Sequence, residues 1–367
     1  MPVSISGTNG VTFPDSSLQA AAASPYVLKN RIINGAMTID QRNAGASVTP
    51  ANGAYTLDRW GVNQFANASK FSVQQSSTVP TGFNNSLIVT SLSAYSVAVG
   101  DIYSIFQRIE GFNVADLGWG TANAQTVTLS FWVRSSLTGT FGGAFQNDAG
   151  DRAYPFTYTI SAANTWEQKS ITITGDTTGT WLKTNGLGLQ ITFGLGVGSN
   201  RSSTAGSWQA GNFGSATGAT SVVGTNGATW YLTGVQLEVG TSATPFERRL
   251  YGQELALCQR YLPIADSTGG DGYYAGQCSA TSAGYIAIPF SVPARDKPTG
   301  ITLSAAATSY AVTTSLAGQV APTGIVFTDG GITSGLVNFT GASSLTAGNA
   351  TLLNVNGNKI FFTGCEL

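Results

Sequence analysis

Apolar and polar residues alternate along most of this chain. Between Val127 and Arg134 the apolar residues stand at positions 127, 129, 131 and 133, so they share one face of an extended strand. Turn-forming pairs such as Asn185-Gly186 separate such runs. The same alternation is repeated in residues 171–173, 189–197 and 235–239. Many short strands with no helical pattern between them favour a β-sandwich or jelly roll.

One stretch, residues 246–262, departs from this alternation and is typical of a helix. Its residues Tyr251, Leu255, Cys258 and Leu262 follow one another at the spacing of a heptad seam. A helix of this length is too short to be stable alone, so it must pack on something. Two alternatives are open: the helix lies on its own domain, or copies of it form a short bundle on an oligomer axis.

The residues after this helix predict a second β unit. Residues 273–280 and 285–290 are expected to pair as a hairpin. A further hairpin is expected over residues 352–362, because Asn356-Gly357 is the signal of a type I′ turn.

Charge is almost absent from the middle of this second unit. Between Thr299 and Asn358 the only charged residue is Asp329. A β segment of this composition would aggregate edge to edge if it were exposed on a monomer. We therefore expect other subunits to cover much of it, in an obligate oligomer.

Residues 1–28 differ from both β units. Residues 11–19 predict a short strand and a turn, and an Ala-rich run follows them. The segment holds too little apolar surface to fold alone, so we expect it to dock onto another subunit or protein.

The predicted fold class is all-β: a jelly-roll β-sandwich followed by a short helix and a second, smaller β-sandwich. The predicted divisions are an N-terminal attachment segment (1–28), the jelly roll (29–249), a connecting helix (250–262) and a C-terminal β-sandwich (263–367).

Composition narrows the function classes. Charged residues make up 10% of the 367 residues, against about 25% in an ordinary soluble domain, which excludes a long coiled coil. Aromatic residues make up 10%, which argues against disorder. The net charge of −1 gives no electrostatic footprint for nucleic acid.

The chain contains no His, so Ser-His-Asp catalysis, Cys-His catalysis and His-ligated zinc are excluded. Cys258, Cys278 and Cys365 are too far apart for a CxxC metal site or a disulfide framework, and we expect buried free thiols. No apolar run reaches the roughly 18 residues of a membrane span, and the first residues lack the pattern of a signal peptide. We expect no membrane insertion and no cofactor.

Several stretches resemble a domain that is common in bacteriophage tail-fibre and other virion proteins. Residues 30–42 and 55–60 resemble its opening, residues 230–240 and 244–249 its close, and residues 254–261 the segment that often follows it. Residues 5–7 and 11–19 resemble the short attachment segment of phage fibres. The resemblance covers residues 1 to about 262.

The resemblance implies a galactose-binding-like jelly roll, the architecture of several carbohydrate-binding modules. In that family an Asn-Gly pair and an acidic residue of the last strand often hold a structural calcium. Asn34-Gly35 is kept, but Met37-Thr38 replaces the usual Phe-Glu, and Thr233 stands in place of the acid. Without carboxylate ligands a hard cation loses most of its affinity, so calcium is not expected.

Candidate glycan-binding residues are aromatic residues in loops with polar residues beside them. Trp60, Trp132, Trp166 and Trp230 lie in or beside predicted strands and are expected in the core. The loop candidates are Trp119, Trp181 and Trp208, with Arg201 and Asn212 as hydrogen-bonding neighbours of Trp208, and Asp271, Tyr273 and Tyr274 in the second β unit. Each loop Trp could instead cap the core, and each of these groups could fill a subunit contact.

An enzyme is not expected. Glycan hydrolysis needs a pair of carboxylates, and Asp148 with Asp151, or Asp58 or Asp101 with Glu110, are the pairs that can be written down. None has a supporting motif, and residues 148–152 fit a hairpin tip.

The favoured function is a homotrimeric phage tail-fibre or receptor-binding protein on the virion. It would dock on other virion proteins through residues 1–28 and bind a host surface glycan without cleaving it. The alternatives are a capsid decoration or head-fibre protein with no ligand and, less favoured, a glycan hydrolase.

Overall fold

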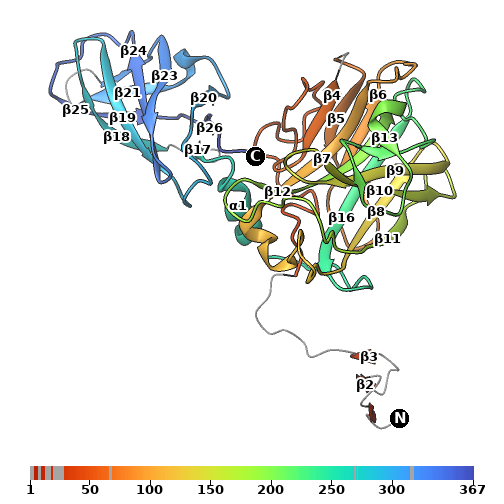
Figure 1. The fold of residues 1–367 in the computed structure, drawn as a ribbon. Helices are drawn as coiled ribbons and strands as arrows, with labels where there is room; N and C mark the ends of the chain where they lie inside the picture. Colours follow the sequence, from red (N-terminus) through yellow and green to blue (C-terminus); the bar gives the residue numbers. More distant parts are fainter. Residues whose placement is uncertain are drawn as a thin grey trace.

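The computed structural model describes residues 29–65, 68–267, 270, 272–314 and 318–367, together with three short strands near the N-terminus (Figure 1). Those strands, β1 (Ser4–Ser6), β2 (Gly10–Thr12) and β3 (Leu18–Gln19), form an antiparallel sheet of their own. The rest of the predicted attachment segment lies outside the described residues.

The first β unit is a sandwich of two antiparallel sheets. The six-stranded sheet has the order β14 (Gln209–Ala210), β10 (Arg152–Ile160), β9 (Gly139–Gln146), β12 (Leu187–Val197), β7 (Ile102–Glu110) and β4 (Gly61–Phe65). The five-stranded sheet has the order β11 (Glu167–Ile173), β8 (Val127–Ser135), β16 (Thr229–Val239), β6 (Ser86–Ser91) and β5 (Phe71–Ser76). The short helical turns η1 (Gly111–Asn113) and η2 (Ala115–Leu117) follow β7.

The alternating residues form the core between these sheets. The apolar residues at positions 127, 129, 131 and 133 of β8, and those at 189, 191, 193 and 195 of β12, are all fully buried. Trp60 and Trp230 are buried among them, as expected. The expectation is wrong for Trp132 and Trp166, which are only partly buried and lie outside this core. The strands predicted from alternation, and with them the all-β class, are confirmed.

A long connection after β12 folds back over the outer face of the six-stranded sheet. It contains η3 (Ser199–Arg201), β13 (Ser202–Ser203) and β15 (Ser215–Ala216), and β13 and β15 pair in parallel. Gly142 of β9 makes this close approach possible, because a Cβ there would lie 2.9 Å from the backbone nitrogen of Ala216. The connection therefore covers one part of the sheet and leaves the other part open.

Helix α1 (Tyr251–Gln259) lies on its own domain, which is one of the two alternatives that the sequence left open. Cys258 and Tyr261 are buried against Ile33 and Ile39 of the first β unit. The predicted seam between copies is therefore wrong for Cys258 and Leu262, because this chain itself buries both of them. Of the four seam residues, Leu255 packs partly on the same cluster and Tyr251 is exposed.

The second β unit has a sheet of seven strands and a sheet of three, with η4 (Ala307–Ser309) between strands. The seven-stranded sheet has the order β22 (Gly318–Val320), β21 (Ala311–Thr314), β25 (Ala350–Asn354), β18 (Tyr273–Cys278), β19 (Ala283–Pro289), β24 (Ser334–Thr340) and β23 (Gly324–Gly330). The three-stranded sheet has the order β17 (Ile264–Asp266), β26 (Lys359–Thr363) and β20 (Gly300–Leu303).

Of the two predicted hairpins in this unit, one is confirmed and one is wrong. Strands β18 and β19 pair antiparallel as expected. Asn356 and Gly357 both have positive φ, as a type I′ turn requires, but the strands on either side of them belong to different sheets. The turn carries the chain from one sheet to the other.

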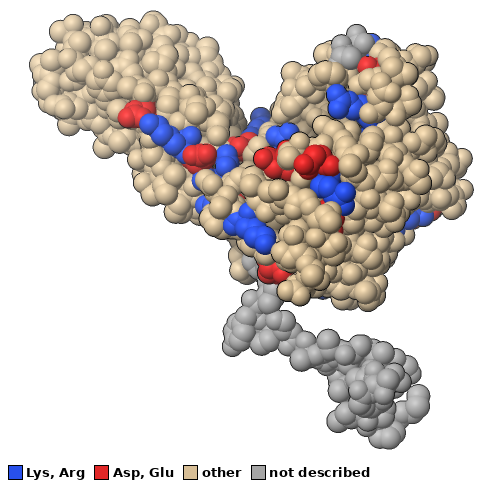
Figure 2. Space-filling view, viewed as in Figure 1, with Lys and Arg blue, Asp and Glu red and all other residues tan. Residues whose placement is uncertain are grey.

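The two β units and α1 meet at a region of paired charges, here called the joint: Arg42, Asp58, Arg59, Glu110, Arg260, Tyr261 and Glu366. In the face shown in Figure 2, charged side chains gather between the two β units. Glu366, next to the last residue, pairs with Arg59 and with Arg42, the latter at 2.9 Å. Most of these residues lie in the stretches that carry the family resemblance.

Glu110, Arg260 and Tyr261 of the joint are also bound to one another. Arg260 donates two hydrogen bonds to Glu110, at 2.6 and 3.0 Å, and Tyr261 donates a third at 2.8 Å. The guanidinium of Arg59 lies 3.5 Å from the centre of the Tyr261 ring. Burial in this joint raises the pKa of Tyr261 to about 12.

The side chain of Asn34 serves this local architecture. It donates to the backbone oxygens of Ile39 and Asp58, at 2.8 and 2.9 Å, and accepts from the nitrogen of Ile39. Thr233, at the position of the family's acidic ligand, donates to the backbone oxygen of Asn85. Within the described ranges, no group of three or more acidic or Cys side chains is placed to hold a metal ion.

All three cysteines are buried and free, as expected. Among the helices that the structure describes, none is long and apolar enough to span a membrane.

Candidate functional site

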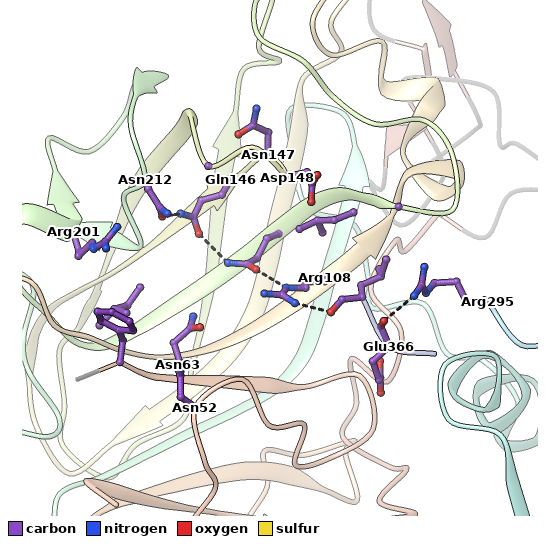
Figure 3. Close-up of a pocket in the computed structure, with 17 residues that line it drawn as sticks. Asn52, Asn63, Arg108, Gln146, Asn147, Asp148, Arg201, Asn212, Arg295 and Glu366 are labelled. Atoms are coloured by element: carbon purple, nitrogen blue, oxygen red, sulfur yellow. Dashed lines mark hydrogen bonds between the residues drawn. The ribbon is translucent and has the colours of Figure 1, made fainter. Parts of the chain in front are cut away.

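A large hollow lies on the open part of the outer face of the six-stranded sheet (Figure 3). It has a volume of about 520 Å³. Strands β4, β7, β9 and β12 form its floor, and three other segments form its walls: the connection after β12, the β9–β10 turn and the C-terminal residues. The residues that line the hollow include Asn63, Phe65, Arg108, Gln146, Asp148, Gln190, Arg201, Asn212, Arg295, Glu366 and Leu367.

A row of hydrogen-bonded polar side chains crosses the floor from strand to strand. Arg108 of β7 donates from Nε to Oε1 of Gln190 in β12, at 2.9 Å. Gln190 donates to Oε1 of Gln146 in β9 at 3.0 Å, and Gln146 donates to Oδ1 of Asn212 at 2.7 Å. Because each group holds the next, the row presents planar polar groups in fixed orientations.

Strand alternation places these residues on the outer face. In β12, Gln190 stands between Leu189 and Ile191, which point into the core. Arg108 and Gln146 have the equivalent outward positions in β7 and β9. The sequence analysis did not name Arg108, Gln146 or Gln190, and their outward position between buried neighbours is the signal that could have found them.

The other side of the floor offers an aromatic surface. Phe65, at the end of β4, is 52% exposed, and the guanidinium of Arg201 lies 6.0 Å from the centre of its ring. Asn63 points to the same side and donates to Oγ of Ser104 at 3.0 Å. An exposed ring beside amide groups gives the hollow both apolar and hydrogen-bonding surfaces.

The second β unit supplies one wall. The backbone oxygen of Leu367 accepts hydrogen bonds from Arg108, at 2.6 Å, and from the hydroxyl of Tyr55, at 2.8 Å. Arg295 donates to the backbone oxygens of Asn185, Cys365 and Glu366. The hollow is thus built from both β units, and the joint holds the tail that closes it.

Two carboxylates line the hollow, in different settings. Glu366 is bound to Arg42 and Arg59 in the joint. Asp148 is exposed in the turn between β9 and β10, where residues 148–152 form the expected hairpin tip. The Asp58 and Glu110 carboxylates are engaged in the joint, by Gln41 and by Arg260 respectively.

The predicted role of two loop tryptophans as exposed glycan platforms is wrong. Trp119 and Trp181 are only 3% and 8% exposed. They meet Trp208 in a cluster in which ring centres lie 4.9 to 5.3 Å apart. Each indole N–H donates to a backbone oxygen. The loop tryptophans cap the core, which is the alternative that the sequence also offered.

The remaining jelly-roll candidates fall into two groups. Trp208 is partly exposed and also packs edge-on against Tyr154, but it does not line the hollow. Arg201 and Asn212, chosen as its neighbours, do line it. The structure therefore places these two polar residues with Phe65 and the amide row.

The candidates of the second β unit do not form one site. Tyr273 and Tyr274 are successive residues of β18, so they point to opposite faces of the sheet. Tyr273 is exposed, whereas Tyr274 packs against the core, and burial raises its pKa. Asp271 lies outside the described residues.

No protein-family model and no curated protein sequence matches this chain. Among solved structures, it is similar over 52% of its length to the enzymatically active domain of tailspike protein 4 of bacteriophage CBA120, with 14% identity and a TM-score of 0.31. The match spans 21% of that tailspike chain.

Two carbohydrate-binding modules are also similar. The family 11 module of a Clostridium thermocellum cellulase matches at 13% identity and a TM-score of 0.28, over 55% of this chain and 99% of the module. The module TmCBM61, solved with β-1,4-galactotriose, matches at 10% identity and a TM-score of 0.26, over 49% of this chain and 88% of the module. At these scores no conclusion about this chain rests on the similarity.

Proposed function

We propose that this protein binds a glycan, without cleaving it, in the hollow on the six-stranded sheet. The observation that carries the proposal is the row of Arg108, Gln190, Gln146 and Asn212, held side chain to side chain across three strands. A concave site with apolar surface and a few fixed polar groups is how ligand sites are normally built.

The chemistry of these groups suits sugars. Amide and guanidinium groups are planar and can hydrogen-bond neighbouring hydroxyls of a sugar ring, while its C–H face can stack on an aromatic ring. Phe65 provides that ring, and Asn63 lies in the same strand. The three strands that carry Arg108, Gln190 and Gln146 span about 10 Å, since neighbouring strands lie about 4.8 Å apart. A chain of sugars fits this length better than a single sugar does.

The setting of the carboxylates in the hollow supports a non-catalytic role. Hydrolysis of a glycosidic bond uses two carboxyl groups on either side of it. Of the carboxylates that line the hollow, Glu366 is neutralised by two arginines and Asp148 lies at a hairpin tip. This leaves adhesion as the simplest role of the site.

We place this binding on a phage particle, in a tail-fibre or receptor-binding protein that adheres to the host surface. The motifs of residues 30–42, 55–60 and 244–261 support that placement. In this proposal residues 1–28 attach the chain to other virion proteins, and several copies assemble. Several weak sites on one fibre then gain affinity through their effective concentration.

A second candidate is a structural virion protein with no ligand, such as a capsid decoration. The packing of Trp119 and Trp181 into the core favours it, because the aromatic loop residues expected to bind sugars are used internally.

The test is binding of the full chain to host cells and to a panel of bacterial surface polysaccharides, followed by calorimetric titration of the best binder. Gln190→Ala and Phe65→Ala should each weaken binding about tenfold, or about 1.4 kcal/mol. Gln168→Ala, on the exposed side of β11, and Phe112→Ala, in exposed η1, are the matched controls and should bind normally.

If the wild-type chain binds neither cells nor any polysaccharide, the structural alternative replaces the proposal. If it binds and all four variants bind equally well, the site lies elsewhere on the molecule.

A further inference from the structure

The outer face of the seven-stranded sheet is apolar and solvent-exposed. Strands β18, β19, β23, β24 and β25 each turn one set of side chains toward the core and the other set outward. The core set includes Ile286, Val337 and Phe339, which are fully buried. The outward set includes the apolar residues Tyr273, Ala275, Tyr285, Ala287, Val326, Leu336 and Leu352 and the polar residues Gln277, Thr328, Ser334, Asn338 and Thr340.

These outward residues form continuous rows across the sheet. Gln277 of β18 pairs with Tyr285 of β19, Tyr285 with Asn338 of β24, and Asn338 with Val326 of β23. In a second row Leu352 of β25 pairs with Ala275. Tyr285 and Val326 are 43% and 54% exposed and stand in the same row, so these exposed residues belong to one surface and are not scattered.

Charge is sparse on this face. In the described residues of the seven strands the one charged side chain is Asp329 of edge strand β23, which lies opposite the outward-facing Leu336, and Lys297 pairs with it at 2.7 Å. On the side of the second β unit seen in Figure 2, a few acidic and basic groups are visible and most of the surface is uncharged. A neutral face neither repels an identical face nor selects a charged partner.

We propose that a second copy of this chain covers this face. Stacked sheets pack through their side-chain surfaces about 10 Å apart, and a neutral, apolar sheet face suits an identical face.

The size of the face supports this occupant. Seven strands about 4.8 Å apart make the sheet about 29 Å wide, and its longer strands are about 20 Å long. The face therefore offers about 600 Å² per copy, and two copies together bury about 1,200 Å². That area is the lower limit for a stable protein–protein interface.

This contact differs from the helix seam expected from the sequence, because it places the interface in the second β unit. It also does not depend on glycan binding in the hollow, because no residue of this face lines the hollow.

The test is sedimentation of the full chain at micromolar concentration. The wild-type chain should sediment as an oligomer. Tyr285→Lys and Val326→Lys place a charge in the patch from different strands, and each should release monomers at the same concentration. Tyr251→Lys in α1 and Val99→Lys in the first β unit are matched controls at exposed positions, and both should remain oligomeric.

A wild-type chain that sediments as a monomer overturns the proposal, as does an oligomer that dissociates with Tyr251→Lys and not with Tyr285→Lys. A melting curve for each variant identifies any that fails to fold. Tyr285→Ser, which removes apolar area without adding charge, then carries the test and should raise the dissociation constant at least tenfold. An unchanged dissociation constant contradicts the inference.

Discussion

The joint and the hollow are neighbouring polar regions that share the C-terminal tail, yet they are built on different chemistry. In the joint Arg59 is buried, Glu366 is nearly so, and the two lie against one another. In the hollow the polar groups are mainly neutral amides that hold one another and keep one side open. Closed charge pairs suit a region that fixes two β units together, and open amides suit a region that meets a ligand.

The joint and the hollow also differ in where their residues lie relative to the motifs of the sequence. The stretches that resemble phage virion proteins supply Arg42, Asp58, Arg59 and Arg260 to the joint. The amide row comes from residues outside those stretches. The recognisable motifs therefore supply most of the joint, while the residues of the proposed glycan site have no motif of their own.

The largest expected effect is on the joint. Arg59→Ala leaves the charge of Glu366 with only Arg42 as its partner and removes the cation over the Tyr261 ring. Breaking a buried ion pair in this way costs about 3–5 kcal/mol. Arg201→Ala, in the hollow, should cost well under 1 kcal/mol and reduce glycan binding instead. Urea unfolding of both variants measures the difference, and equal losses would contradict the distinction between the two regions.

The next effect is a loss of stability in alkali that originates in the joint. Burial raises the pKa of Tyr261 from 10.0 to about 12. The folded protein therefore holds this proton more tightly than the unfolded chain. The stabilisation that arises from this raised pKa is about 2–3 kcal/mol. It is fully present below pH 10 and is lost as the pH rises toward 12.

Tyr261→Phe has no proton to lose at this position. Its free energy of unfolding should fall less steeply than that of the wild type between pH 10 and pH 12, although it starts lower because the bond to Glu110 is gone. Tyr251→Phe, at an exposed position of the same helix, is the control and should follow the wild-type curve. If the free energy of unfolding falls equally steeply with pH in all three proteins, Tyr261 does not cause the loss of stability in alkali.

A smaller effect is expected where the connection after β12 lies on the sheet. Gly142→Ala places a Cβ against Ser215 and Ala216, so the connection must move. Overpacking of this kind costs about 1–3 kcal/mol. Because the same connection carries Arg201 and Asn212, binding should weaken too. Gly100→Ala, where a Cβ meets no neighbour within 4 Å, is the control. If Gly142→Ala is destabilised but still binds the glycan normally, the connection after β12 does not contribute to the binding site.

Local pattern predicted the elements of the fold well and their long-range pairing poorly. The buried residues of β8 and β12 follow from alternation, which depends only on nearest neighbours in the chain. The turn at Asn356-Gly357 was also predicted, but its two strands join different sheets, because pairing is decided by partners far away in the sequence.

The candidate site was predicted only in part, for the same reason. Arg201 and Asn212 were found because they lie close together in one loop. Arg108, Gln146 and Gln190 come from three separate strands, and only the folded sheet brings them into one row. Trp119 and Trp181 look like exposed loop residues in sequence, but contacts between distant loops bury them.

A smaller effect on stability is expected at Gln146, which orients other members of the row. This side chain is nearly buried, so it contacts a ligand little, but it accepts from Gln190 and Thr192 and donates to Asn212. Gln146→Leu keeps the volume and removes these three bonds. The cost should be about 1 kcal/mol of stability, typical of a neutral hydrogen bond, because Gln190 and Thr192 can still pair with one another. Gln190 and Asn212 then lose their fixed orientation, and glycan affinity should fall several-fold, less than in Gln190→Ala. Gln146→Glu keeps an acceptor for Gln190 and loses only the donor to Asn212, so its affinity should lie between those of Gln146→Leu and the wild type. Calorimetric titration orders the three proteins, and equal affinities would mean that the row is not what positions the ligand.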